Sequence, residues 1–289
     1  GAGGQTDIYG TLTMESLEIL GSDSVTSHGA EITARQGLTY DDTLKVEGSS
    51  SMNAGGSIRF KQALGGNGAG GDDNLELSAG TSIDFDAQVG AADALESLTI
   101  SEAATVTFDD TLEVAGDVVI TADTVNFGAG VSLTDSGSLT IEADTVTFSG
   151  AADIAGDINL TADEVDFSSG ANSIQSTDGG SLNIQTRTSG LGIDIALSEA
   201  AGQLDISDTD LAALVDGGFS SIVIGTGAGS EVSIGGSSGH TFKDVSYVYG
   251  SSVTFADQAE EFSSADELHI RSSGALTVKN TLNADQGLW

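Results

Sequence analysis

Apolar and polar residues alternate along much of the chain in short runs, and these runs recur about every 20 residues. Four of the runs end in phenylalanine, at Phe108, Phe127, Phe148 and Phe167, with spacings of 19, 21 and 19 residues. In each of them a valine lies two residues before the phenylalanine. A period of two is typical of a strand with one buried face. The runs therefore predict strands that each point a valine and a phenylalanine inward.

A second alternating run precedes most of these strands, and it carries a pair of aliphatic residues: Leu98 and Ile100, Leu139 and Ile141, Ile158 and Leu160, Leu182 and Ile184. Gly, Asp, Ser and Asn, which tolerate turn geometry, lie between the runs. A repeat of about 20 residues is too short for a helix pair or a propeller blade, but it suits one rung of a parallel β-solenoid. The predicted fold class is all-β, a parallel β-helix with rungs of ~20 residues.

The repeat extends beyond its clearest part, because YDDTLKVEG at 40–48 returns as FDDTLEVAG at 108–116. We therefore expect residues 1–289 to form a single elongated β-helix of about 12 to 14 rungs. With rungs ~4.8 Å apart, this would be a rod about 60 Å long. Irregular rungs are expected over 1–73 and 187–289, and a regular acidic shaft over 74–186.

The composition agrees with such a coil. The chain has no proline, and proline cannot donate to a strand ladder. It also has no cysteine, so disulfides and thiolate chemistry are excluded. No apolar run is long enough to span a membrane, and we expect no membrane insertion.

Acidic residues far outnumber basic ones, and the basic residues are unevenly distributed along the sequence. The formal net charge is −36, and residues 62–186 contain no Lys or Arg against 22 Asp and Glu. A polyanionic surface disfavours nucleic acid as a partner. Such surfaces repel one another unless divalent cations or high ionic strength reduce the repulsion. An acidic surface suited to a saline environment, without discrete ion sites, is the alternative interpretation.

Three acids recur in phase with the repeat, since Asp123, Asp144 and Asp163 each lie two residues before the valine of a phenylalanine run. In a coil they could stack ~5 Å apart, and stacked like charges destabilise unless something neutralises them. Carboxylate and turn carbonyl oxygens are ligands that Ca²⁺ prefers, so this column is a candidate calcium site. Asp72 and Asp73, in the glycine-rich segment 65–74, form a second candidate. The alternative is that these side chains point into water, and no cofactor is required in either case.

An alternative function is that of a polysaccharide lyase or hydrolase, because such enzymes use β-helices with clustered aspartates. Asp84 with Asp86, and Asp208 with Asp210, are carboxylate pairs of this kind. However, the acidic stretch has no basic residue to stabilise a developing negative charge. We therefore predict that the chain is not an enzyme.

Two longer phrases carry a family resemblance. NLELSAGTSIDFDAQVGAADALESLTI at 74–100 and LDISDTDLAALVDGGFSSIVIG at 204–225 resemble the repeats of giant filamentous-haemagglutinin-like bacterial exoproteins. The resemblance implies a right-handed parallel β-helix outside the cell, and one short helical turn near 208–216. Asp208 could cap that turn and Gly217 could end it. The resemblance supplies no catalytic residues.

These observations predict a structural segment of a bacterial cell-surface or extracellular fibre, which could assemble end to end into filaments of a biofilm matrix or surface layer. The ends of the chain show no obvious cap, and an open strand ladder can add another copy, so head-to-tail or lateral self-association is expected. The alternative is an adhesin stalk or binding module whose loops, at 61–74 or 226–241, recognise glycans or a neighbouring cell surface.

Overall fold

The computed structural model is all-β, with 58% strand and 2% helix, and its parallel sheets stack as a β-solenoid of about 11 turns of about 21 residues. The predicted fold class is confirmed. The turns are fewer than the 12 to 14 expected. The chain divides into two compact units, 1–140 and 141–289, each with its own strands and core. The structure describes residues 5–20, 24–68, 72–90, 93–196, 202–226, 229–235, 240–256, 262–279, 282–284 and 287–288.

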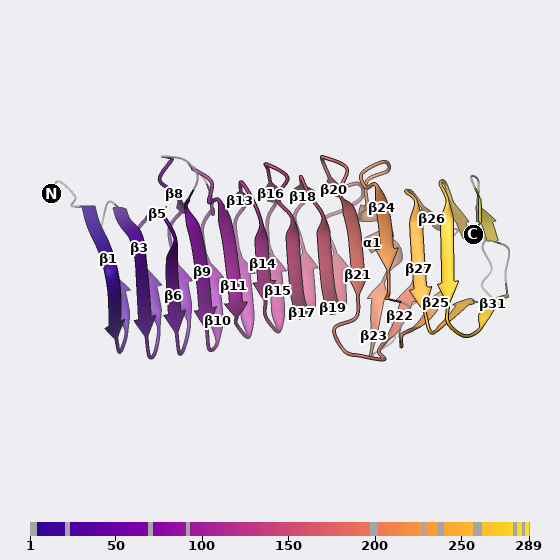
Figure 1. The fold of residues 1–289 in the computed structure, drawn as a ribbon, viewed down its shortest axis with the longest axis horizontal. Coiled ribbons are helices and arrows are strands. Elements are labelled where there is room, and N and C mark those ends of the chain that lie inside the picture. Colours follow the sequence, from indigo (N-terminus) through magenta and orange to yellow (C-terminus); the bar gives the residue numbers. More distant parts are fainter. Residues whose placement is uncertain are drawn as a thin grey trace. The chain divides into compact units, whose positions relative to one another are not determined.

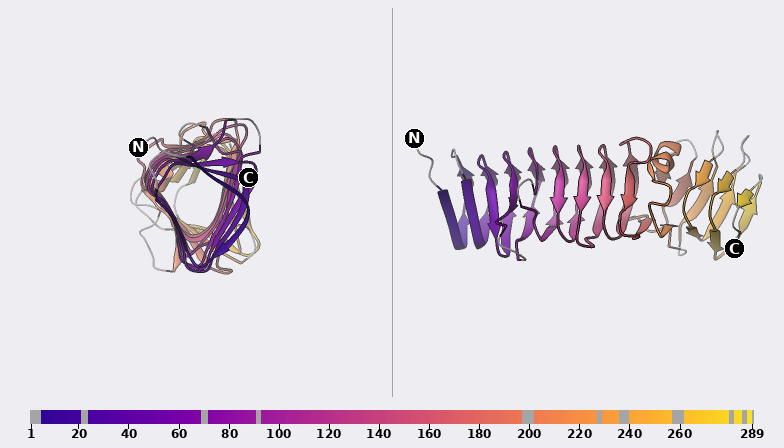
Figure 2. Two further views of the ribbon diagram at one scale, coloured as in Figure 1. Left: turned by 90° about the vertical axis from the view of Figure 1, so that its left-hand side faces the viewer. Right: turned by 90° about the horizontal axis from the view of Figure 1, so that it is seen from above.

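In unit 1 the strands form three columns of parallel strands (Figures 1 and 2), and successive members of the first two columns pair with each other. The first column contains β1 (Gln5–Met14), β3 (Ser24–Ala34), β6 (Ser50–Ala54), β9 (Asn74–Ala79), β11 (Ser97–Glu102) and β14 (Val118–Thr121). The second contains β2 (Leu17–Ile19), β4 (Leu38–Tyr40), β7 (Ile58–Phe60), β10 (Ser82–Phe85), β12 (Thr105–Phe108) and β15 (Thr124–Phe127). The third contains β5 (Leu44–Glu47), β8 (Leu64–Gly66), β13 (Leu112–Val114) and β16 (Val131–Leu133), and the start of β3 pairs with β5.

The core of unit 1 is a ladder of aromatic rings in the second column. Phe85 and Phe108 stack with ring centroids 4.6 Å apart and planes 2° apart. Phe127 continues the stack after Phe108, and Phe60 and Tyr40 extend it in the other direction. All five side chains are at most 1% exposed. The ladder of aromatic residues therefore begins at Tyr40, well before the clear part of the sequence repeat. Each stacked pair of rings stabilises the fold by about 0.5–1.5 kcal/mol beyond the effect of burial.

Unit 2 is also built of three columns, with longer connections between its strands. The first contains β17 (Leu139–Phe148), which begins just before the unit boundary, then β19 (Ile158–Phe167), β21 (Ser181–Gln185), β24 (Ser221–Ile224), β27 (Ser246–Gly250) and β30 (Leu268–Ser272). The second contains β22 (Gly192–Ile195), β23 (Gln203–Ile206), β25 (Glu231–Ile234), β28 (Ser252–Phe255) and β31 (Leu276–Val278). The third contains β18 (Ala152–Ile154), β20 (Ile174–Ser176), β26 (His240–Phe242), β29 (Phe262–Ser264) and β32 (Leu282–Ala284).

Two strands of unit 2 are stacked out of chain order. Strand β22 pairs on one side with β23 and on the other with β25, so the spatial order is β23, β22, β25. Strand β22 therefore precedes β23 in the chain but lies between β23 and β25 in the sheet. Ile193 lies opposite Leu204, and Ile195 opposite Ile206, so the inward pattern of both strands is preserved. The reversal brings Asp194 directly opposite Asp205.

A short helix, α1 (Asp208–Ala213), follows β23. It lies where the helical turn was predicted, but the predicted cap is wrong: the N-cap is Ser207, not Asp208. Ser207 accepts a hydrogen bond from the Asp210 amide, and the Asp210 carboxylate accepts one from the Ser207 amide at 2.7 Å, which is a capping box. The helix ends at an extended Leu214, so Gly217, with φ of 71°, belongs to the turn beyond it. Within the described residues, no helix is long and apolar enough to cross a membrane.

Candidate functional site

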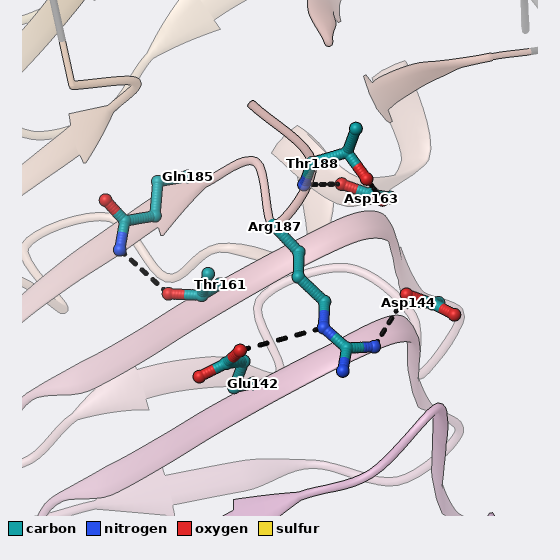
Figure 3. A network of polar contacts seen from close by, with 7 residues as sticks. All are labelled: Glu142, Asp144, Thr161, Asp163, Gln185, Arg187 and Thr188. Carbon is teal, nitrogen blue, oxygen red and sulfur yellow. Dashed lines mark hydrogen bonds and ion pairs between the residues drawn. The ribbon is translucent and has the colours of Figure 1, made fainter. Parts of the chain in front are cut away.

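The predicted acid column is distributed over both units. Asp123 is exposed and precedes β15 in unit 1, whereas Asp144 and Asp163 lie on β17 and β19 in unit 2. Asp144 and Asp163 occupy the same position relative to Val146 and Val165, both of which are buried. The unit 2 pair has well-defined polar partners (Figure 3).

Arg187, just beyond the end of β21, folds back onto the acidic surface (Figure 3). Its Nη1 lies 2.6 Å from Asp144 Oδ1, and its Nε lies 3.7 Å from Glu142 Oε1. The guanidinium therefore neutralises acidic residues of β17. One of them, Asp144, belongs to the column at which the sequence predicted a calcium ion. Both carboxylates are more than half exposed, so each ion pair contributes at most about 1 kcal/mol.

Asp163 is held by the residue next to Arg187. The Thr188 backbone N–H donates to Asp163 Oδ1 at 2.7 Å, and the Thr188 hydroxyl donates to Oδ2 at 2.5 Å. Gln185 Nε2 donates to Thr161 Oγ1 at 2.8 Å on the same face. The corner after β21 is thus fastened to β17 and β19 by side chains, and Asp163 acts as an acceptor for a corner amide.

The role of Arg187 was not predicted, because residues 62–186 contain no Lys or Arg and Arg187 lies just beyond this stretch. The signal was present, since Arg187 follows Asp144 by 43 residues, close to two turns of about 21 residues. Within the part of the chain that the structure describes, no cluster of three or more His, Cys, Asp or Glu is arranged to hold a metal. Calcium binding at Asp123, Asp144 and Asp163 stays a prediction.

The second candidate pair divides into two different environments. Asp73 is 7% exposed, and its carboxylate accepts from the backbone amides of Asn67 at 2.9 Å and Gly48 at 3.1 Å. Asp72 is exposed. Asp73 therefore caps two corner amides of unit 1, a structural role, and residues 69–71 of this segment lie outside the described residues.

The acid pairs considered for catalysis also have structural partners. Asp86 binds Arg59, with Oδ2 2.7 Å from Nη2, and Asp84 accepts a hydrogen bond from Ser82 at 2.8 Å. Asp210 is 4% exposed and accepts the Phe167 backbone N–H at 2.6 Å in addition to its bonds with Ser207. It thus joins α1 to β19.

Further buried carboxylates of unit 2 were not expected. Asp194 is 6% exposed, and the Gln203 amide, oriented with its nitrogen toward Asp194, donates to both carboxylate oxygens at 2.7 and 2.9 Å. Asp244 is 3% exposed and accepts the Gly217 amide at 3.0 Å. The sequence signal for the first was the matching pair GIDI and QLDI, in which an acid lies between two apolar residues of each strand.

Burial of these carboxylates predicts that the protein becomes more stable on mild acidification. Burial raises the pKa of Asp194, with the charge of Asp205 adding to the effect, and burial likewise raises the pKa of Asp210 and Asp244 despite their hydrogen bonds. The folded state therefore binds protons more readily than the unfolded state, whose carboxyl pKa is 3.8. Stability is gained as pH falls through the raised values toward 3.8, and lost as pH rises through them.

The measurement is the melting temperature of the protein between about pH 7 and pH 4. We expect Tm to rise on acidification and the rise to be smaller in Asp194→Asn, which cannot take up the proton. A Tm that falls steadily over this range in the unmodified protein would contradict the assignment.

Arg187 and calcium should compete for the same carboxylates. We expect Arg187→Ala to bind Ca²⁺ roughly fivefold more tightly, because a unit charge at 4 Å in water is worth about 1 kcal/mol. Calorimetric titration with CaCl₂ measures this, and Arg59→Ala, which breaks the ion pair with Asp86 in unit 1, is the matched control. Equal calcium affinity in Arg187→Ala and Arg59→Ala would show that Asp144 does not bind the ion.

Comparison of the chain with protein-family models, with curated proteins and with solved structures gives no match. The β-solenoid itself is compatible with a β-helical repeat shaft.

Proposed function

We propose that this chain is a structural, noncatalytic segment of a bacterial cell-surface or extracellular fibre, similar to the shafts of filamentous-haemagglutinin-like exoproteins. The observation that carries the proposal is the ladder of stacked, buried rings from Tyr40 to Phe127. Repeated stacking of equivalent side chains, each contacting the next turn, gives a coil in which every rung adds to the stiffness.

The polar groups support a structural role rather than a reactive one. Asp73, Asp163, Asp210 and Asp244 each accept a backbone N–H from a neighbouring turn or corner. Arg187 is ion-paired with Asp144 and Glu142. These groups hold neighbouring turns together. The carboxylates accept hydrogen bonds from backbone N–H groups at the corners, which have no partner in the strand ladders.

Assembly is part of the proposal. In unit 2, Leu276 and Val278 of β31 are 52% and 49% exposed, although they continue the buried positions of Val253 and Phe255. Apolar side chains at inward positions are suited to contact with a turn supplied by another copy, which would continue the strand ladder. The acidic surface opposes side-by-side contact, so divalent cations should promote lateral association.

The test is sedimentation velocity of the purified chain over a range of concentrations, with CaCl₂ and with chelator. We expect concentration-dependent association that Leu276→Lys with Val278→Lys abolishes. Val119→Lys is the control, because Val119 is also exposed, at 39%, but points outward from β14. A single non-associating species in both buffers, or an equal effect of the Val119 control, would contradict self-assembly through β31.

A further inference from the structure

The outer face of unit 2 carries a shallow hollow over β19, β21 and β24. Its volume is about 260 Å³, and its polar lining comes from Asn159, Thr161, Asn183 and Gln185, with Val223 and Gly225 beside them. The hollow exists because short side chains on β24 follow long amide side chains on β21. Gly225 has φ of 80°, and a Cβ there would lie 2.2 Å from the Tyr249 carbonyl oxygen, so this position stays open.

The amide side chains are held in fixed orientations. Asn183 Nδ2 donates to Asn159 Oδ1 at 2.9 Å. Gln185 Nε2 donates to Thr161 Oγ1 at 2.8 Å, as Figure 3 shows. Each primary amide has two donor hydrogens and an oxygen with two lone pairs. Asn183 uses both of its amide hydrogens, on Asn159 and on Ser181, so its oxygen remains as an acceptor, whereas Gln185 keeps one donor hydrogen as well as its oxygen. The ladder bonds thus orient the amide planes and leave the hollow with both donors and acceptors.

Two tyrosines lie on β27, the strand next to β24. Tyr247 of β27 lies in register with Val223, and Tyr249 follows two residues later, with ring centroids 6.2 Å apart. The Tyr247 ring stacks on His269 of β30, at 4.5 Å and 15°. Tyr247 therefore lies between His269 on one side and Val223 on the other, whereas Tyr249 lies beside Gly225, which has no side chain and lines the hollow.

We propose that this surface, from β19 to β27, binds a neutral oligosaccharide. Oriented amides and hydroxyls match sugar hydroxyl groups, which also donate and accept, while a tyrosine face suits the apolar C–H face of a pyranose ring. The site spans three strand spacings of ~4.8 Å, or about 14 Å, which is the length scale of a short oligosaccharide.

Charge and topology argue against other occupants. Glu142 and Asp144 border the Thr161 side and take up the charge of Arg187, and the net charge of −36 disfavours an acidic glycan. A peptide strand needs an open sheet edge for its backbone hydrogen bonds, whereas these side chains project from a face whose strands are paired on both sides. This binding site goes beyond the structural role proposed above and does not depend on it.

The test is calorimetric titration of the full chain with cellohexaose, chitohexaose and maltohexaose. We expect saturable binding of at least one of them. Tyr247→Ala and Tyr249→Ala should each weaken it roughly two- to tenfold, and Val223→Trp, which fills the hollow, should abolish it. Tyr9→Ala is the matched control, since Tyr9 is 66% exposed on β1 in unit 1, and it should leave the affinity unchanged.

Circular dichroism and Tm establish that each variant remains folded. If a tyrosine variant does not fold, Asn183→Ala tests the same surface and should also weaken binding. Polygalacturonate, an acidic polysaccharide, should not bind. Failure of all three neutral hexasaccharides to bind would overturn the proposal. So would binding that survives the loss of both tyrosines, or tighter binding of polygalacturonate than of any neutral probe.

Discussion

Replacing Phe108 by alanine is expected to lower the free energy of unfolding of the region around it by about 3–5 kcal/mol. Its ring lies between those of Phe85, at 4.6 Å, and Phe127, at 5.2 Å, and is 1% exposed. Truncation leaves a cavity lined by two rings that are tied to their own strands, so the site cannot collapse to fill it. Chemical denaturation monitored by circular dichroism measures the loss.

Two further variants separate this mechanism from a general effect of substitution. Phe108→Leu keeps most of the volume and should cost less than the alanine variant. Tyr9→Ala removes an aromatic ring that is 66% exposed in the same unit and should change stability by no more than about 0.5 kcal/mol. If Tyr9→Ala were as damaging as Phe108→Ala, the stacked ladder would not be the main source of stability in unit 1.

Replacing Asp210 by alanine is expected to have the second largest effect, a loss of about 2–4 kcal/mol, because it leaves buried amides without acceptors and removes a capping box. The Phe167 N–H, now bonded at 2.6 Å, and the Ser207 N–H, at 2.7 Å, would lose their partner together. Hydrogen exchange should show faster exchange at Phe167 and through α1.

The control for Asp210 is Asp178→Ala, which removes an exposed aspartate of the same unit and should alter stability little. Asp210→Asn is a more demanding variant: it keeps one acceptor oxygen and removes the buried charge, so we expect a smaller loss than with alanine. Unchanged exchange at Phe167 in Asp210→Ala would contradict the link between α1 and β19.

The inward positions of the coil were predictable because stacking repeats them. Val106 with Phe108, and Val125 with Phe127, were expected to face inward, and each pair lies in register with the next. The start of the ladder at Tyr40 was harder to see, because the surrounding repeat varies in length and only the echo at 40–48 marks it.

The polar features and the strand order depend on three-dimensional contacts that the repeat does not encode. GIDI and QLDI carry the same alternation, so nothing in either indicates that β22 and β23 exchange places in the stack. Ser207 rather than Asp208 caps α1 because Asp210, three residues on, completes the reciprocal bonds. To predict the ion pair between Arg187 and Asp144, one would need to know the length of each turn to within a residue or two.

Electron microscopy with fibre diffraction on the concentrated chain, in millimolar CaCl₂ and after chelation, tests whether the chain forms an end-to-end fibre. We expect filaments in which the rungs lie perpendicular to the axis, and therefore a reflection at ~4.8 Å along the filament axis. Loss of the filaments on chelation would assign their contacts to calcium bridging. Dispersed particles in both conditions, or a ~4.8 Å reflection perpendicular to the axis, would contradict an end-to-end structural fibre.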